Sequence, residues 1–128
     1  MTVELNHTIV AAHDKHESAA FLADLLGLTV SPPYGPFVPV EIPNGVTLDY
    51  MDVGDGPIPS QHYAFLVSED EFTEIFGRIQ AAGLTYWADP GHHREGEINR
   101  NDGGRGAYFD DPNGHNMEIL TRPYGSGG

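Results

Sequence analysis

Within its 128 residues the chain repeats one order of elements, and this repeat limits the fold more than any other feature of the sequence. The tripeptide GLT occurs at 27–29 and again at 83–85, each time after a stretch with helical periodicity. The tripeptide PNG occurs at 43–45 and 112–114, each time before a short stretch with strand character. Each tripeptide alone is common in turns, but their shared order and shared neighbours favour an internal duplication.

Each copy is predicted to contain one strand, one helix and three further strands. Asp14 with Glu17, and Ser68 with Glu71, carry the spacing of a capping box, in which two side chains satisfy free N–H groups at a helix start. We therefore predict an α+β domain of paired βαβββ modules that form a curled mixed sheet, with module 1 about 1–56, module 2 about 57–122 and a flexible tail at 123–128. The predicted helices are 15–26 and 69–82, and the predicted strands are 3–11, 28–31, 37–42, 46–52, 61–67, 85–88, 105–110 and 115–121.

The composition narrows the classes of partner and ligand. Six Lys and Arg stand against 19 Asp and Glu, which gives a formal net charge of −13 and opposes contact with nucleic acids and anionic membranes. The N-terminal sequence has neither the basic start nor the apolar run of a signal peptide, so we expect a cytoplasmic protein. The sequence contains no cysteine, which leaves His, Asp and Glu to bind any metal.

Four polar residues in the predicted strands are candidates for such a metal site. Strand alternation places His7, His62 and Glu118 on the same faces as apolar neighbours. Taken singly, each is most simply a hydrogen-bonded residue at a strand end or in the core. The duplication changes this interpretation, because a pseudo-twofold axis between two βαβββ halves brings the first and last strands of each half towards one cleft. Alignment of EIPNGVTLDY at 41–50 with DDPNGHNMEI at 110–119 pairs Asp49 with Glu118.

Two imidazoles and a carboxylate suit a divalent first-row metal. Open coordination positions favour Fe(II), although Mn, Zn, Co and Ni fit similar ligands. Asp49 is one methylene shorter than a glutamate, so it serves either as a fourth ligand or as a base that accepts a proton near the metal.

The segment between the second helix and the closing strand is a candidate pocket wall. Tyr86 and Trp87 offer flat surfaces to a bound ligand, or they pack beneath the loop. Arg94 and Arg105 bind an acidic group of the substrate, or they pair with surface carboxylates. Tyr108 is a candidate hydrogen-bond donor or acid in the cleft, and a core tyrosine is the alternative. Asn99, in the same segment, completes the predicted substrate contacts.

Two other patterns compete with this site. His92 and His93, with Glu95 and Glu97 nearby, form a rival metal cluster in a predicted loop. GGRG at 103–106 resembles a phosphate-binding loop but lacks the strand, the helix and the Lys-Ser/Thr pair that such a loop requires.

The chain resembles the vicinal oxygen chelate superfamily, which includes glyoxalase I, fosfomycin- and bleomycin-resistance proteins and extradiol dioxygenases. LNHTIVAAHDKHESAAFLADLLGL is similar to the superfamily's opening strand and helix, QHYAFLV to its fifth strand and GGRGAYFDDPNGHNMEIL to its closing hairpin. The resemblance implies paired βαβββ modules around a metal, with His7, His62 and Glu118 as ligands. Where glyoxalase I has a glutamate ligand, this chain has Asp49, which departs from the four-ligand isomerase pattern.

A narrower similarity is to the branch that contains the chartreusin-pathway dioxygenase, carried by YGPFVPVEIPNG, YWADP and the TRPYG ending. It implies an Fe(II) dioxygenase-like cleavage or rearrangement of an aromatic polyketide-type substrate, with dioxygen or an activated oxygen donor. The resemblance to the superfamily, whose members of this length often pair, implies a homodimer. The alternatives are a glyoxalase-like isomerase, lyase or transferase that uses its metal as a Lewis acid, and a resistance protein that binds an antibiotic without catalysis.

Overall fold

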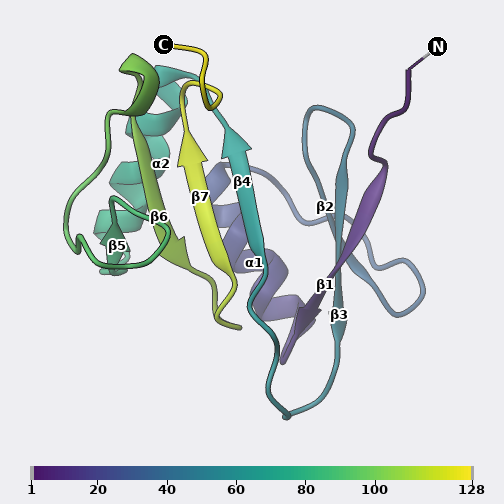
Figure 1. The fold of residues 1–128 in the computed structure, drawn as a ribbon. Helices are drawn as coiled ribbons and strands as arrows, with labels where there is room; N and C mark the ends of the chain where they lie inside the picture. The colour runs from purple at the N-terminus through teal and green to yellow at the C-terminus, as the bar shows by residue number, and fades with distance from the viewer. Residues whose placement is uncertain (1, 128) are drawn as a thin grey trace. The chain divides into compact units, whose positions relative to one another are not determined.

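The computed structural model describes residues 2–127. The chain divides into two compact units, the first ending at Ile58 and the second beginning at Pro59, and each unit contains one mixed sheet and one α-helix. The predicted α+β class is confirmed (Figure 1). No helix within the described residues is both long enough and apolar enough to cross a membrane.

The first unit is a three-stranded sheet with a helix on one face. Strand β1 pairs in parallel with β3, and β2 pairs antiparallel with β3 on its other side. Asp14 caps the helix by accepting hydrogen bonds from the backbone N–H groups of His16 and Glu17, which is the first half of the predicted capping box; a return bond from Glu17 to the Asp14 N–H is not among the bonds of this cap. Gly27 ends the helix with a φ of 72°. The elements are β1 (His7–Ala12), α1 (Lys15–Leu26), β2 (Val38–Glu41) and β3 (Thr47–Asp52).

Two predicted strands of this unit differ from the structure. The strand expected at 3–11 begins at His7, because its partner β3 begins at Thr47. The strand expected at 28–31 is reduced to one bridge between Val30 and Val40. Prolines follow at 32 and 33, and proline has no N–H to donate to a ladder, so pairing ends there.

The second unit is a four-stranded sheet in the order β4-β7-β6-β5, with β4 and β7 parallel and the other pairs antiparallel. The capping box of Ser68 and Glu71 is present as predicted. Phe72, Ile75 and Ile79 of the helix are buried, as are Phe109, Met117 and Ile119 of the sheet. The elements are β4 (His62–Leu66), α2 (Glu69–Ala81), β5 (Tyr86–Trp87), a 3₁₀ turn η1 (Asn101–Gly103), β6 (Gly106–Asp110) and β7 (Asn116–Leu120).

The candidate site residues occupy equivalent positions in the parallel strand pairs of the two sheets. In the first unit His7 pairs with Thr47, and Asp49 follows two residues later on the same face of β3. In the second unit His62 pairs with Asn116, and Glu118 follows two residues later on the same face of β7. Each unit therefore presents one histidine and one carboxylate on neighbouring parallel strands.

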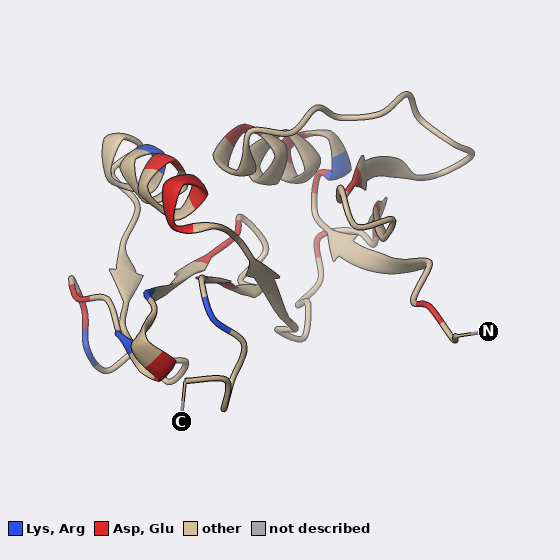
Figure 2. Ribbon diagram, turned by 90° about the horizontal axis from the view of Figure 1, so that it is seen from above, with Lys and Arg blue, Asp and Glu red and all other residues tan. Residues whose placement is uncertain are grey.

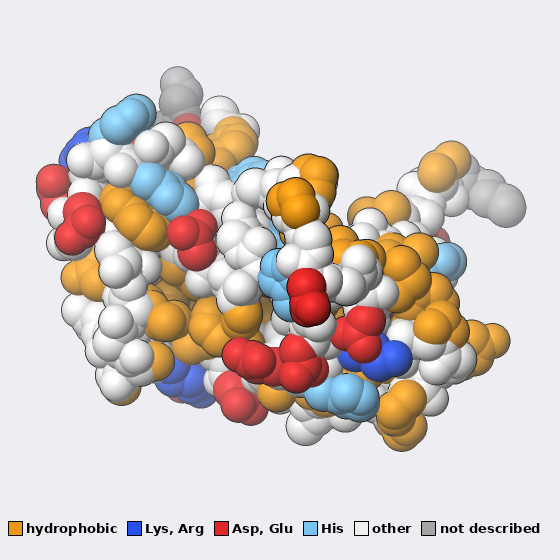
Figure 3. Space-filling model, turned by 90° about the horizontal axis from the view of Figure 1, so that it is seen from below, with side chains coloured by type: hydrophobic (Ala, Val, Ile, Leu, Met, Phe, Trp, Pro, Cys, Tyr) orange, Lys and Arg blue, Asp and Glu red, His pale blue; other side chains and the backbone are white. Residues whose placement is uncertain are grey.

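Acidic residues far outnumber basic ones along the whole ribbon (Figure 2). The molecular face drawn in Figure 3 likewise carries several acidic side chains and few basic ones. This distribution gives an anionic ligand little positive charge to bind.

Candidate metal centre

His62 and Glu118 meet on one face of the second sheet. The parallel register of β4 and β7 places them on adjacent strands, with His62 Nε2 3.0 Å from Glu118 Oε1. The His62 side chain is 44% exposed, whereas that of Glu118 is only 1% exposed. The imidazole thus lies between solvent and a buried carboxylate, and burial of a carboxylate requires compensating partners.

The hydrogen bond of His62 Nδ1 determines whether Nε2 presents a hydrogen or a lone pair to Glu118. His62 Nδ1 is 2.9 Å from the carbonyl oxygen of Asn116, which can only accept a hydrogen bond, so Nδ1 carries the hydrogen. In a neutral imidazole Nε2 then presents a lone pair to Glu118 Oε1, which also presents a lone pair. A proton or a metal cation must bridge the two atoms. A histidine that donates one N–H to a carbonyl and offers its other nitrogen is the usual arrangement of a metal ligand.

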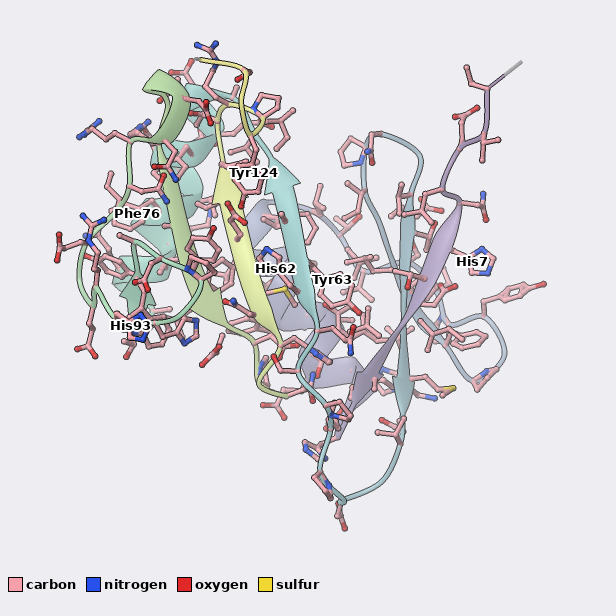
Figure 4. All side chains as sticks on the ribbon, in the orientation of Figure 1. His7, His62, Tyr63, Phe76, His93 and Tyr124 are labelled. Atoms are coloured by element: carbon pink, nitrogen blue, oxygen red, sulfur yellow. The ribbon has the colours of Figure 1, made fainter. Side chains whose placement is uncertain are left out.

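Tyr124 satisfies the carboxylate from the other side. Its hydroxyl lies 2.6 Å from Oε1 and 2.7 Å from Oε2 of Glu118 and donates to this pair of oxygens. Figure 4 shows Tyr124 reaching from the C-terminal segment onto the face of the sheet that carries His62. Two effects raise the pKa of Tyr124 above its ordinary value: burial of the hydroxyl, which is the larger, and its hydrogen bond to Glu118. The hydroxyl therefore keeps its hydrogen.

Tyr108 extends this hydrogen-bonded chain. It faces Glu118 across the β6–β7 ladder, and its hydroxyl lies 3.0 Å from that of Tyr124. Because Tyr124 donates to Glu118, it accepts from Tyr108. Burial, the Tyr124 hydrogen bond and the charge of Glu118 raise the pKa of Tyr108. The ring also stacks on that of His62, with centroids 5.8 Å apart. Tyr108 thus lies on the predicted face, and reaches the carboxylate through a residue that sequence reasoning missed.

The segment that carries Tyr124 is held in place by hydrogen bonds. The Asp102 carboxylate accepts from the backbone N–H groups of Gly125 and Gly127, at 3.1 and 3.2 Å. The sequence predicts a flexible tail at 123–128; within the described part of it, these two bonds fix the backbone on both sides of residue 126. The dipeptide Pro123-Tyr124 has no periodic neighbours that would reveal this contact, and only its position just after β7 hints at it.

His92 and His93, the alternative metal ligands considered above, make other contacts in the loop after β5. The His92 ring stacks on Trp87 with centroids 3.7 Å apart, and its Nε2 lies 3.0 Å from the side-chain oxygen of Asn116. His93 is hydrogen-bonded to Asp89 through its backbone N–H and through Nδ1. Across residues 2–127 no three His, Asp or Glu side chains are gathered as a ready metal cluster.

The five predicted substrate contacts each have a partner inside the second unit. The Tyr86 ring packs edge-on against Phe76, and Trp87 stacks on His92. The Asn99 side chain is buried and donates to the carbonyl oxygen of Ala88. Arg94 pairs with Glu97 at 3.3 Å, and Arg105 pairs with Glu69 at 2.8 Å. For the aromatic and arginine residues, these contacts match the packing and ion pairing predicted as alternatives to substrate binding.

His7 and Asp49 belong to the first unit. His7 projects from the start of β1 (Figure 4), with its Nδ1 2.7 Å from the side-chain oxygen of Asn6. Both residues line an open pocket of about 500 Å³ on the face of the sheet opposite α1. The structure thus brings together His62, Glu118 and Tyr108 in one unit, and His7 with Asp49 in the other.

Comparison with known proteins places this geometry in a family. The sequence profile of the Glyoxalase/Bleomycin resistance protein/Dioxygenase superfamily matches residues 4–119. The chain belongs to this superfamily. Members of the superfamily generally depend on a divalent metal. The donors present in the chain fit such a metal, because the Nε2 lone pair of His62 and the carboxylate of Glu118 already face each other.

Three relatives within the superfamily are informative. Oxidase ChaP-H2 is 79% identical, with a TM-score of 0.97 over 100% of both chains. Oxidase ChaP-H1 is 64% identical, with a TM-score of 0.93 over 97% of this chain and 99% of that one. Glutathione transferase FosA from Serratia marcescens is 31% identical over 124 residues, which is 93% of this chain and 81% of the relative. The two oxidases support an oxidative enzyme.

Proposed function

We propose that this protein is an Fe(II)-dependent, dioxygenase-like enzyme that cleaves or rearranges an aromatic polyketide-type substrate in secondary metabolism. The observation that carries the proposal is the lone pair of His62 Nε2, fixed by the Nδ1 bond to Asn116 and directed at the buried carboxylate of Glu118. Such an arrangement requires a bridging cation or proton. The high identity to two proteins named as oxidases supports the oxidative class.

The proposed metal ligands are His7, His62 and Glu118. His7 qualifies because it occupies in β1 the register position that His62 occupies in β4. Two histidines and one carboxylate favour Fe(II), and Mn, Zn, Co or Ni can bind the same donors. The metal would supply a chelating centre for adjacent substrate oxygens and for dioxygen or an activated oxygen donor. We propose that the enzyme acts in the cytoplasm as a homodimer.

Residues around the proposed metal orient its ligands and accept a proton from the substrate. The Asn116 carbonyl fixes the tautomer of His62, and Tyr124 holds the Glu118 carboxylate by donating to its oxygens. Tyr108 donates to Tyr124 and offers its ring to the same face as His62. Asp49 serves as an acceptor for a substrate proton, because a carboxylate on the open face of β3 can take a hydrogen from a phenol or enol.

Metal content and oxygen uptake of the protein and its Glu118→Gln variant test this proposal. We expect the parent to bind one equivalent of iron and to consume oxygen with substrate, and we expect Glu118→Gln to lose most of both. Glu97→Gln is the matched control, because Glu97 is exposed and pairs with Arg94 on the surface. Full metal content and full oxygen uptake in Glu118→Gln would refute the proposed ligand set.

A second candidate is a metal-assisted group transfer or isomerisation, favoured by the 31% identity to glutathione transferase FosA. In that case the metal acts as a Lewis acid and no oxidant is consumed. Product formation at the full rate under argon would support this candidate and exclude the oxygenase.

A further inference from the structure

The hydroxyl of Tyr124 is held over Glu118 although the ring that carries it is poorly packed. The residue is 64% exposed, while its hydroxyl donates to both oxygens of the Glu118 carboxylate, at 2.6 and 2.7 Å. An aromatic side chain that buries so little of its surface gains little from the hydrophobic effect, so the core does not fix its ring. The position of the hydroxyl therefore depends on the backbone around residue 124.

This backbone forms a local turn just after β7. The Ser126 N–H donates to the carbonyl oxygen of Pro123 at 3.1 Å, and Arg122 Nη2 donates to the carbonyl oxygen of Ser126 at 3.2 Å. Both bonds join residues of the same short segment. They shape the turn, but its attachment to the rest of the second unit requires a contact from elsewhere in the chain.

Asp102 supplies that contact from the turn η1. Its Oδ2 accepts from the N–H of Gly125 at 3.1 Å, and its Oδ1 accepts from the N–H of Gly127 at 3.2 Å. The C-terminal segment and η1 lie at the same end of the second sheet (Figure 1). The two backbones also pack closely, since a Cβ added at Gly127 would overlap the backbone carbonyl of Asp102. Asp102 thus holds the segment through its carboxylate and through close backbone packing.

The backbone of Asp102 is itself in an uncommon conformation. Its φ of 57° and ψ of 21° lie in the left-handed region, which aspartate tolerates better than most side chains but which glycine adopts at lower cost. Strained residues of this kind cluster at functional positions. The turn is anchored behind it, because the Asn101 N–H donates to the Asn99 side chain at 3.2 Å and Asn99 exchanges two backbone bonds with Gly106 of β6. The carboxylate is therefore presented from a fixed point on the sheet.

We propose that Asp102 is a positioning residue of the candidate metal centre. It holds the segment 123–127, this segment holds the Tyr124 hydroxyl on Glu118, and the hydroxyl orients the carboxylate that binds the metal. Loss of the Asp102 carboxylate therefore weakens metal binding without removing a ligand. The inference rests on the proposed function for the statement that Glu118 binds a metal, whereas the attachment of the segment is independent of it.

Chymotrypsin cleavage after Tyr124 reports release of the segment in metal-free protein. Such cleavage follows the fraction of molecules in which a held segment is open. Asp102→Gly removes both acceptors and suits a positive φ, so we expect cleavage to be at least about tenfold faster. Asp102→Asn keeps one acceptor oxygen and tolerates the same backbone conformation, so we expect an intermediate rate. Intact-mass spectrometry identifies the product that has lost residues 125–128.

A second variant releases the segment without changing Asp102. Gly127→Ala places a Cβ against the Asp102 carbonyl, so we expect faster cleavage here too. Gly56→Ala is its matched control, because a Cβ at Gly56 meets open space. Asp55→Gly is the control for Asp102→Gly, since Asp55 is an exposed loop residue of the first unit. Both controls should be cleaved at the parental rate, and circular dichroism checks the folding of all variants.

The affinity for Mn(II), measured by competition with a chromophoric chelator, tests the effect on the metal centre. We expect Asp102→Gly to bind Mn(II) about tenfold more weakly, the lower end of the loss known for groups that orient a ligand. Asp102→Asn should recover most of this loss. In a Tyr124→Phe background, Asp102→Gly should cost less than about twofold more, because residues that serve one contact are not additive.

Three results would overturn the inference: parental cleavage in Asp102→Gly, parental Mn(II) affinity in that variant, or a full tenfold loss from Asp102→Gly in the Tyr124→Phe background. The last result would mean that Asp102 does not act through Tyr124. Because cleavage is measured without metal, the two failures are distinguishable. A parent that binds no metal refutes the proposed ligand set, whereas parental cleavage in Asp102→Gly refutes the attachment by Asp102 alone.

Discussion

The Tyr124 hydroxyl lies within 2.7 Å of both carboxylate oxygens of Glu118. A buried carboxylate needs such a donor, and the bond fixes the plane of the carboxylate relative to His62. The C-terminal segment is therefore part of the candidate metal centre. Groups that orient a ligand in this way are known to affect metal affinity by roughly tenfold to a hundredfold.

Replacement of Tyr124 by phenylalanine should weaken metal binding by about tenfold to a hundredfold, because Glu118 loses the donor that orients it. Competition with a chromophoric chelator measures the Fe(II) and Mn(II) affinities. Tyr86→Phe is the matched control, since the Tyr86 ring packs on Phe76 away from the carboxylate. Equal affinities in Tyr124→Phe and the parent would show that Glu118 does not use this bond to bind metal.

Asn116 links the loop after β5 to the candidate ligand His62. Its side-chain oxygen accepts from His92 Nε2 at 3.0 Å, its side-chain nitrogen donates to the carbonyl of Pro90 at 3.2 Å, and its own carbonyl accepts from His62. We expect Asn116→Ala to release the loop and to speed its proteolysis at 90–96, with a loss of stability of about 1 kcal/mol for the bonds removed. Limited proteolysis with mass spectrometry measures the cleavage.

His93→Ala is the control for this experiment, because His93 is exposed and bonds to Asp89 within the loop itself. If the loop of Asn116→Ala is cleaved no faster than that of the parent, the link between Asn116 and His92 does not hold the loop.

Acid should destabilise the second unit through the start of α2. Backbone and side-chain hydrogen bonds from Ser68 lower the pKa of Glu71 below its ordinary value of 4.5. The native state therefore binds the proton less tightly than the unfolded chain, so the contribution to stability is present above pH 4.5 and lost as the pH falls through the lower native pKa. We expect Glu71→Gln, which keeps a capping-box residue, to show a flatter dependence of Tm on pH between about 6 and 3.

Thermal melts of the parent, Glu71→Gln and Glu74→Gln provide the comparison. Glu74 lies on the exposed side of the same helix and pairs loosely with Arg78, at 3.9 Å. If the Tm of Glu71→Gln falls with pH as steeply as the Tm of the parent, protonation of Glu71 does not contribute to the loss of stability in acid.

Local patterns in the sequence predicted much of the fold, because helix caps and strand alternation are set by neighbouring residues. The caps at Asp14 and Ser68 are both present, and Glu118 and His62 lie together on one sheet face. Tyr124 could not be predicted in this way. Its contact depends on the path of the chain after β7, which is fixed by the carboxylate of Asp102, a residue more than twenty positions earlier. No periodic pattern connects these positions.

Arg105 illustrates the other limit, since its residue type alone fits two roles. The sequence predicts a substrate contact or a surface ion pair, and the guanidinium bonds Glu69 and Thr73 and lies 4.5 Å over the ring of Phe72. Arg105→Lys should therefore lower Tm by several degrees, because lysine cannot reproduce the forked hydrogen bonds or stack on the ring. If Arg105 only stabilises the fold, the KM and the metal affinity of this variant should equal those of the parent when both are measured below the Tm of the variant. A raised KM with parental Tm would instead assign Arg105 to the substrate.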